Sequence, residues 1–196
     1  MKKEKDYKYK VFSIGYGDGG WIKDSKATNL FDESDIVVFP GGADIQPEIY
    51  GEKAGRHTGG WAENDDRHIN FYKRCIEQNK YMVGICRGHQ LINALQPKGK
   101  LIQHVTNHHG GHMIKTAKGE EMLTNSIHHQ MVYPWNMDKN TYTILGWCEG
   151  NSTCYLDGND KQNKFPVEAY TKEGLIIEPE IIFLNKVRAL TVQFHP

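Results

Sequence analysis

A cysteine framed by glycines follows a short apolar segment near the middle of the chain. In Gly84-Ile85-Cys86-Arg87-Gly88 the cysteine stands two residues after one glycine and two before the next. At a sharp turn from a strand into a helix, such a cysteine is lifted out of the sheet, and glycines are needed where the backbone crowds itself. The N-terminus of the helix favours the thiolate and can lower the pKa of the thiol. Cys86 is therefore a candidate nucleophile; the alternative is an inert buried cysteine of the kind common in intracellular proteins.

A second candidate for catalysis is a glycine pair that follows another apolar segment. Residues 35–40 read Asp-Ile-Val-Val-Phe-Pro, and Gly41 and Gly42 come directly after them. Glycines at the end of a buried strand can leave backbone N–H groups pointing outward, as an oxyanion hole requires. Taken alone, the segment favours an ordinary tight turn.

Three short apolar strands and two helices are expected to position these residues. Strands are predicted at residues 10–15, 35–40 and 81–85, and nearly continuous apolar runs are typical of parallel strands covered on both faces. Residues 64–79 predict a helix, because Asn64 or Asp65 can cap it and apolar residues recur at helical spacing. A second helix follows Cys86. This order predicts an α/β fold, doubly wound, with a mostly parallel central sheet, helices on both faces and the site at the carboxyl ends of the strands.

The remaining segments predict a C-terminal part rich in β-strands. Strands are expected at residues 100–105, 143–148, 167–170, 176–177, 180–184 and 188–194. A short helix is expected within residues 21–31, and loops at residues 15–20, 120–124 and 149–164. The glycine-rich loop 15–20 has neither a Walker lysine nor dinucleotide-binding spacing, which favours a rim loop over a phosphate site. Residues 125–132 mix polar and apolar side chains and predict the buried edge of a pocket.

Three histidines lie close together in residues 107–112. Histidines at this spacing could bind a metal ion, but no carboxylate or cysteine joins His108, His109 and His112 at ligand spacing. The sequence therefore predicts no metal site, and surface or supporting roles for these side chains.

Composition narrows the class of protein. The chain has 196 residues and balances 24 Lys and Arg against 24 Asp and Glu, so it offers no basic field for nucleic acid or an acidic membrane surface. No apolar segment approaches the ~20 residues of a membrane-spanning helix. Residues 1–9 are charged, predict a flexible start and lack the apolar core of a signal peptide. The four cysteines form no C-x-x-C pair. We expect a single cytoplasmic domain with reduced thiols, spanning residues 1–196.

Four motifs, in order along residues 36–196, resemble those of a known superfamily. Gly84-Ile85-Cys86-Arg87-Gly88-His89-Gln90 resembles the nucleophile motif of class I glutamine amidotransferases. Thr191-Val192-Gln193-Phe194-His195-Pro196 resembles their terminal V-Q-F-H-P-E segment. Two further segments resemble the γ-glutamyl-γ-aminobutyrate hydrolase branch: residues 40–44, with Pro47, Tyr50, Gly51 and Glu52, and residues 125–130, Asn-Ser-Ile-His-His-Gln. The resemblance implies the flavodoxin-like fold of this superfamily.

The resemblance also implies roles for individual residues. Cys86 would attack a γ-glutamyl amide to form a γ-glutamyl thioester, and His195 would take the thiol proton and protonate the leaving amine. A thiolate beside an imidazolium is stabilised and nucleophilic near neutral pH, which supports this pairing. The other implied site residues are Gly42 and Arg87, whose backbone N–H groups would form the oxyanion hole, and the substrate-binding Gly41, Gln90, His128 and Gln130. A buried hydrogen-bonded loop is the alternative for His128 and Gln130. No cofactor is implied.

This sequence departs from the superfamily pattern at two places. A glutamate follows His-Pro in the family, where it orients the histidine as a third member of the triad, whereas the sequence ends at Pro196. Three explanations remain open: a sequence cut short, a catalytic dyad, or the α-carboxylate of Pro196 in place of the side chain. The segment between the first strand and Val37 is also short, which leaves the leaving group of the substrate undefined.

Three functions compete at this point. The first is a hydrolase that releases glutamate and an amine from a small γ-glutamyl substrate. The second is a glutaminase subunit that acts on glutamine and supplies ammonia to a separate synthase. The third is a binding protein with a decayed site, against which Cys86 and His195 argue. A homodimer is compatible with all three, and neither nucleic acid nor membrane is an expected partner.

Overall fold

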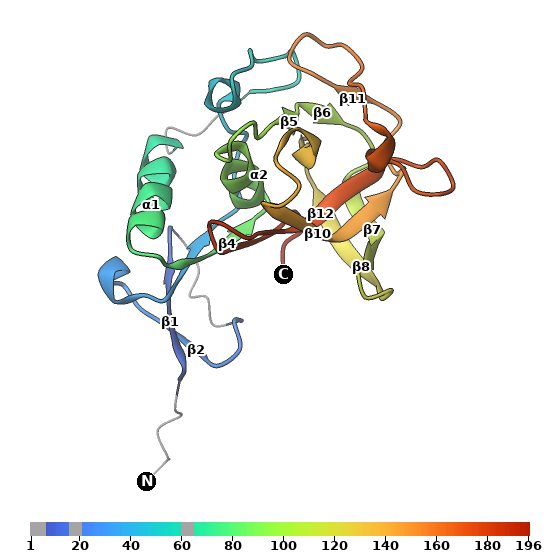
Figure 1. The fold of residues 1–196 in the computed structure, drawn as a ribbon. Coiled ribbons are helices and arrows are strands. Elements are labelled where there is room, and N and C mark those ends of the chain that lie inside the picture. Colours follow the sequence, from blue (N-terminus) through green and yellow to red (C-terminus); the bar gives the residue numbers. More distant parts are fainter. Residues whose placement is uncertain (1–6, 16–20, 60–64) are drawn as a thin grey trace.

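The computed structural model describes residues 7–15, 21–59 and 65–196, and all structural statements concern these residues. One large sheet runs through the molecule (Figure 1). Its strands are β1 (Tyr9–Ser13), β2 (Ser25–Ala27), β3 (Ile36–Phe39), β4 (Tyr81–Ile85), β7 (His109–Thr116), β8 (Glu121–Ile127), β10 (Tyr142–Glu149), β12 (Ile177–Leu184) and β13 (Ala189–Val192). Their spatial order is β2-β1-β3-β4-β13-β12-β10-β7-β8.

The sheet has a parallel half and an antiparallel half. Strands β2, β1, β3, β4 and β13 pair in parallel, whereas β13, β12, β10, β7 and β8 pair antiparallel. In the parallel half, Gly84 of β4 is in register with Phe39 of β3 on one side and with Thr191 of β13 on the other. The carboxyl ends of these three strands therefore meet at one edge, and the segments that follow them are brought together there.

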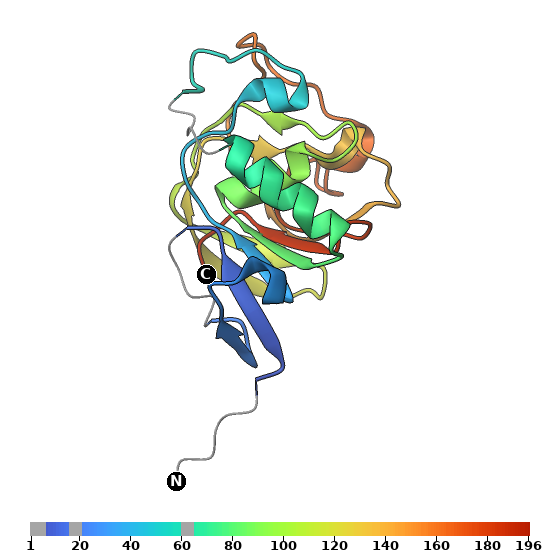
Figure 2. The same cartoon turned by 90° about the vertical axis from the view of Figure 1, so that its left-hand side faces the viewer.

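Two α-helices, α1 (Asp65–Glu77) and α2 (Arg87–Ala94), cover one face of the parallel half. Cys75 of α1 and Leu91 of α2 belong to the same core cluster as Phe39 and Met82 of the strands. Figures 1 and 2 show both helices on the same side of the sheet. The opposite face has a smaller cluster that includes Val38, and no α-helix of the described residues contributes to it.

The remaining elements are short. Two small antiparallel pairs join β5 (Leu101–Ile102) to β9 (Met131–Val132) and β6 (His104–Val105) to β11 (Tyr155–Leu156). Four 3₁₀ helices complete the described chain: η1 (Phe31–Glu33), η2 (Pro47–Tyr50), η3 (Pro134–Asn136) and η4 (Val167–Ala169). None of the helices in the described segments is long and apolar enough to cross a membrane.

The structure confirms the predicted α/β class with its mainly parallel half and β-rich C-terminal part, and it corrects several elements. Within residues 21–31, Ser25–Ala27 form β2 and no α-helix is present, which is one reason that helices do not cover both faces of the described sheet as predicted. Residues 121–124 belong to β8 rather than to a loop, and residues 167–169 form η4 rather than a strand. Residues 101–102 and 104–105 form β5 and β6, whereas residues 177–184 form one strand, β12. The predicted rim loop at residues 15–20 lies largely outside the described residues.

Candidate active site

Cys86 occupies the sharp turn between β4 and α2. Its backbone dihedrals are φ 51° and ψ −107°, in a region that non-glycine residues rarely adopt. Its N–H donates to the carbonyl of Val192 at 2.8 Å, and its carbonyl accepts the N–H of Gln90 at 3.1 Å. A Cβ on Gly88 would lie 2.1 Å from the carbonyl oxygen of Phe39, so only glycine fits there. The predicted strand-to-helix turn is thus present, with its glycine where the backbone demands one.

Two backbone N–H groups converge on the sulfur of Cys86. Burial raises the pKa of the Cys86 thiol above its ordinary value, while hydrogen bonds from the N–H groups of Arg87 and Gly42 act in the opposite direction. The expectation that the helix N-terminus lowers this pKa is therefore outweighed by burial, because Cys86 is only 8% exposed. Backbone N–H groups next to a reactive sulfur are the kind of donors that an oxyanion hole requires.

The side chain of Arg87 holds the turn after β3 and the start of α1 together. Its guanidinium forms a buried ion pair with Asp65 and lies 2.6 Å from Nδ1 of His68. Asp65 also accepts the N–H of Gln46 at 2.8 Å, which ties α1 to the segment that follows Gly42. Burial, and next the charge of Arg87, lower the pKa of His68 to about 4. The backbone N–H of Arg87 thus faces Cys86, whereas its side chain connects α2 to α1.

His195 follows β13 and lies beside Cys86. A Cβ added to Gly41 would lie 2.7 Å from Cε1 of His195 and 3.5 Å from Cβ of Cys86, so Gly41 packs against both. The backbone of His195 is held at two points by Asn125 of β8. The His195 N–H donates to Oδ1 of Asn125 at 2.8 Å, and Nδ2 of Asn125 donates to the His195 carbonyl at 2.9 Å.

Three buried glutamine side chains form a polar group next to the turn. Nε2 of Gln90 donates to the carbonyl of Gln130 at 3.4 Å and to Oε1 of Gln193 at 3.3 Å, and Nε2 of Gln130 donates to Thr58 at 3.3 Å. Oε1 of Gln130 and Nε2 of Gln193 are buried and have no hydrogen-bond partner in the described structure. Buried polar atoms of this kind are normally satisfied.

The turn after β3 is also tied to residues 128–130. Nε2 of His129 lies 3.1 Å from Asp44, and the N–H of Gly59 donates to the same carboxylate at 3.2 Å. The hydrogen bond to Asp44 raises the pKa of His129. Nδ1 of His128 lies 2.9 Å from the carbonyl of Gln130. The structure therefore brings the predicted residues of both motifs into one neighbourhood.

Sequence reasoning missed several residues of this neighbourhood. Asn125 and Gln193 lie inside motifs that the sequence analysis quoted, but their spacing does not indicate their contacts. Thr58 lies in an irregular segment, and no sequence signal marks it. Cys75 of α1 is buried in the core, and burial raises the pKa of its thiol to about 12.

These features define a class of protein. A cysteine on a strained strand-to-helix turn, facing two backbone N–H groups, is the arrangement expected where a thiol attacks a carbonyl group. Comparison with known families agrees, since residues 21–196 match the profile of peptidase C26. The chain belongs to the peptidase C26 family, which is class I glutamine amidotransferase-like.

Curated relatives carry related descriptions. The glutamine amidotransferase-like protein YvdE of Lactococcus lactis subsp. lactis (strain IL1403) is 31% identical over 119 residues, which make up 50% of this chain and 50% of that protein. The glutamine amidotransferase-like protein RP404 of Rickettsia prowazekii (strain Madrid E) is 35% identical over 81 residues, 40% of this chain and 28% of that protein. The match thus spans half the length of YvdE and a smaller share of RP404.

Solved structures share the fold at low sequence identity. A glutamine amidotransferase from Thermotoga maritima aligns with a TM-score of 0.56 and 12% identity over 95% of this chain and 75% of that one. A GMP synthase component from Thermoplasma acidophilum aligns with a TM-score of 0.52 and 14% identity over 96% of this chain and 84% of that one. The glutaminase domain of Trypanosoma brucei CTPS aligns with a TM-score of 0.51 and 11% identity over 95% of this chain and 85% of that one. These similarities confirm the fold class.

Proposed function

We propose that this protein is a cysteine-dependent hydrolase of γ-glutamyl amide bonds, acting through a γ-glutamyl thioester and releasing glutamate and an amine. The observation that carries the proposal is the convergence of the Gly42 and Arg87 N–H groups on the sulfur of Cys86. Donors placed there stabilise the oxyanion of a tetrahedral intermediate more than they stabilise the ground-state carbonyl. Family membership supports amide hydrolysis as the class of reaction.

In this mechanism Cys86 rests as a thiol, because burial raises its pKa. The imidazole of His195 takes the thiol proton as the sulfur attacks the γ-carbonyl, and the Gly42 and Arg87 N–H groups bind the oxyanion. The intermediate collapses with loss of the amine, to which His195 returns the proton. Water activated by His195 then hydrolyses the thioester, releasing glutamate and restoring the thiol.

The glutamyl group of the substrate would occupy the side of the site lined by Gln90 and Gln130. The unpartnered oxygen of Gln130 can accept hydrogen bonds from an α-ammonium group, and the unpartnered nitrogen of Gln193 can donate to an α-carboxylate. Gly41 leaves the space between Cys86 and His195 that a scissile amide requires. His128 would support this side by holding the carbonyl of Gln130.

A second candidate function is that of a glutaminase that passes ammonia to a separate synthase. It is supported by the fold similarity to a GMP synthase component and to a CTPS glutaminase domain. The chemistry at Cys86 is the same in both candidates. They differ in the leaving group and in the need for a partner.

One experiment tests the proposal and separates the candidates. The purified chain is incubated with glutamine and with a panel of γ-glutamyl amines, and glutamate release is measured for the wild type and for Cys86→Ala. The matched control is Cys154→Ala, which removes a half-buried thiol outside the site. We expect turnover of γ-glutamyl amines that Cys86→Ala abolishes and Cys154→Ala retains. Glutamine turnover that requires an added synthase would favour the second candidate, and equal turnover by Cys86→Ala would refute both.

A further inference from the structure

Five ionisable side chains are buried together between β12 and the segments flanking the β7–β8 hairpin. His108 precedes β7, His112 lies in β7, His128 follows β8, and Glu178 and Glu180 lie in β12. Each is at most 8% exposed. No carboxylate joins these histidines at ligand spacing in the sequence, but the fold brings Glu178 and Glu180 to them from β12.

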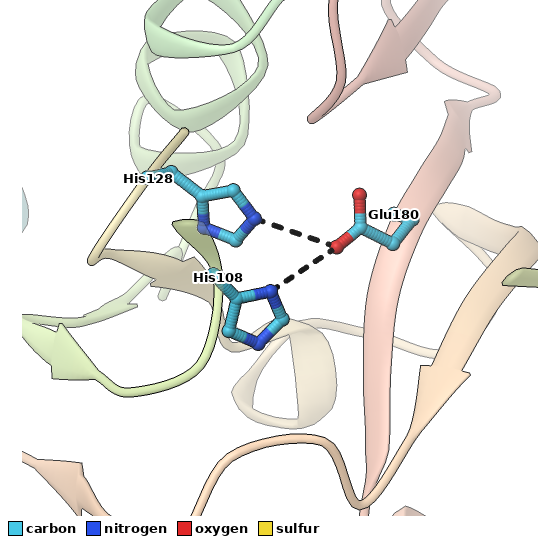
Figure 3. A group of neighbouring side chains, drawn as sticks. All are labelled: His108, His128 and Glu180. Atoms are coloured by element: carbon cyan, nitrogen blue, oxygen red, sulfur yellow. Dashed lines mark ion pairs between the residues drawn. The ribbon is translucent and has the colours of Figure 1, made fainter. Parts of the chain in front are cut away.

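Glu180 is the centre of the group. Its Oε1 lies 3.5 Å from Nε2 of His128, 4.0 Å from Nδ1 of His108 and 3.3 Å from Nε2 of His112. Figure 3 shows the His108 and His128 rings both turned toward this carboxylate. A tetrahedral zinc ion with bonds of about 2.0–2.1 Å needs ligand atoms separated by about 3.4 Å. The spacing in the structure is close to that requirement.

In the His108 and His128 rings, one nitrogen contacts a neighbouring oxygen acceptor and the other nitrogen faces Glu180. Nδ1 of His128 lies 2.9 Å from the carbonyl of Gln130, so that nitrogen carries the proton and Nε2 keeps its lone pair. Nε2 of His108 lies 2.9 Å from Glu178, and its Nδ1 faces Glu180 at 4.0 Å with the Ser126 hydroxyl 3.5 Å away. Glu178 is itself fixed by the hydroxyl of Tyr155 at 2.5 Å and the N–H of Ser152 at 2.8 Å. Carboxylates and carbonyls that orient histidines in this way are typical of metal sites.

Within the described residues, several of these buried atoms form no hydrogen bond of good geometry, although some lie within ion-pair distance of Glu180. Nε2 of His128, both nitrogens of His112 and Oε2 of Glu180 belong to this set. Atoms of this kind cost free energy unless a ligand binds them. We propose that His108, His128 and Glu180 bind a divalent zinc ion, with a water molecule as the fourth ligand.

Zinc is the metal that fits this donor set. Imidazole and carboxylate ligands in a four-coordinate arrangement suit Zn²⁺, whereas Mg²⁺ and Ca²⁺ take six or more oxygen ligands. The ion would join the entry to β7 and the exit from β8 to the interior strand β12. It would therefore fix the segment that includes His128 and Gln130.

The test uses the full chain, stripped of metal with a chelator and then titrated with Zn²⁺ against a chromophoric competitor. We expect one zinc ion per chain, and we expect Co²⁺ in its place to give the visible absorption of a tetrahedral site. At a free zinc concentration of about 100 times Kd, the melting temperature should rise by roughly 5–10 °C. None of these measurements depends on the proposed hydrolase activity, so either proposal can fail alone.

Variants identify the ligands. His108→Ala and Glu180→Gln should each weaken zinc binding about 100-fold or more, and Glu178→Gln about 10-fold. The matched control is His109→Ala, which removes an exposed imidazole adjacent to His108 and should bind zinc like the wild type. Equal binding by the wild type, His108→Ala and Glu180→Gln would overturn the proposal. If those two variants do not fold, the wild-type Co²⁺ spectrum decides, because absence of tetrahedral bands would show that the cluster holds protons rather than a metal.

Discussion

Gly41 offers the sharpest test of where His195 acts. Replacing it with alanine adds one methyl group, which would lie 2.7 Å from Cε1 of His195. Ordinary van der Waals contact begins at 3.4 Å, so the imidazole must move by about 0.7 Å. The contact with Cys86, at 3.5 Å, needs no adjustment. The substitution therefore displaces one of the two proposed catalytic groups and leaves the other in place.

The Gly41→Ala substitution is expected to lower the catalytic rate without destabilising the fold. Misplacing a catalytic group by about 1 Å can lower the rate about 100-fold, so Gly41→Ala should lower kcat by roughly 10- to 100-fold. KM should rise as well, because the added methyl group also occupies space that the scissile amide requires. The unfolding free energy should change by less than about 1 kcal/mol, because His195 is exposed and can shift at little cost.

The assay is steady-state glutamate release on the best γ-glutamyl amine, together with a thermal melt of each variant. Gly59→Ala is the matched control, because a Cβ at Gly59 meets nothing within 4 Å. A Gly41→Ala enzyme with kcat within twofold of the wild type would refute the placement of His195 as the catalytic base. A large loss in both melting temperature and activity would show instead that Gly41 is needed for folding.

Three further predictions follow from contacts around the site. Arg87→Met leaves Asp65 buried without its partner and should cost about 3–5 kcal/mol of unfolding free energy, measured by urea denaturation; a loss under about 1 kcal/mol would contradict the ion pair. The pKa of His68 is lowered to about 4, so the unfolded chain binds this proton first and stability should fall as pH drops from about 6.5 to 4. His68→Gln should flatten the fall, and an unchanged pH profile of the melting temperature would refute this assignment. Asn125→Ala removes both hydrogen bonds to the His195 backbone and should lower kcat about 10-fold at nearly constant KM. An unchanged kcat would show that these two hydrogen bonds are not needed to position His195.

The sequence predicted the parallel half of the fold well because local signals agree there. The apolar strand at Tyr81–Ile85, the glycine at position 88 and the helical spacing of α1 all follow from short-range patterns. Strand β8 was missed for a physical reason. Its buried positions include Thr124 and Ser126, whereas Leu123 is 71% exposed, which inverts the usual alternation of a half-buried strand.

In the candidate site, too, the sequence could predict only the features that depend on neighbouring residues. Cys86 could be found because its turn is local, and its strained backbone then appears in the structure as expected. The histidine–glutamate group could not be found from spacing, because Glu180 lies 72 residues from His108 in the numbering and meets it only through the packing of β12. Packing between segments that are distant in the sequence leaves no periodic pattern in either of them.

The end of β8 connects the two proposals physically. Asn125 holds the backbone of His195, and the next residue, Ser126, donates its hydroxyl to the carbonyl of His108 at 3.0 Å. Successive residues of a strand point to opposite sides, so one strand end contacts the candidate base on one side and the histidine cluster on the other. An ion bound by His108 and His128 would therefore restrict the strand that positions His195. If both proposals hold, the position of the His195 imidazole beside Cys86 would therefore depend on the contacts between the β7–β8 hairpin and β12.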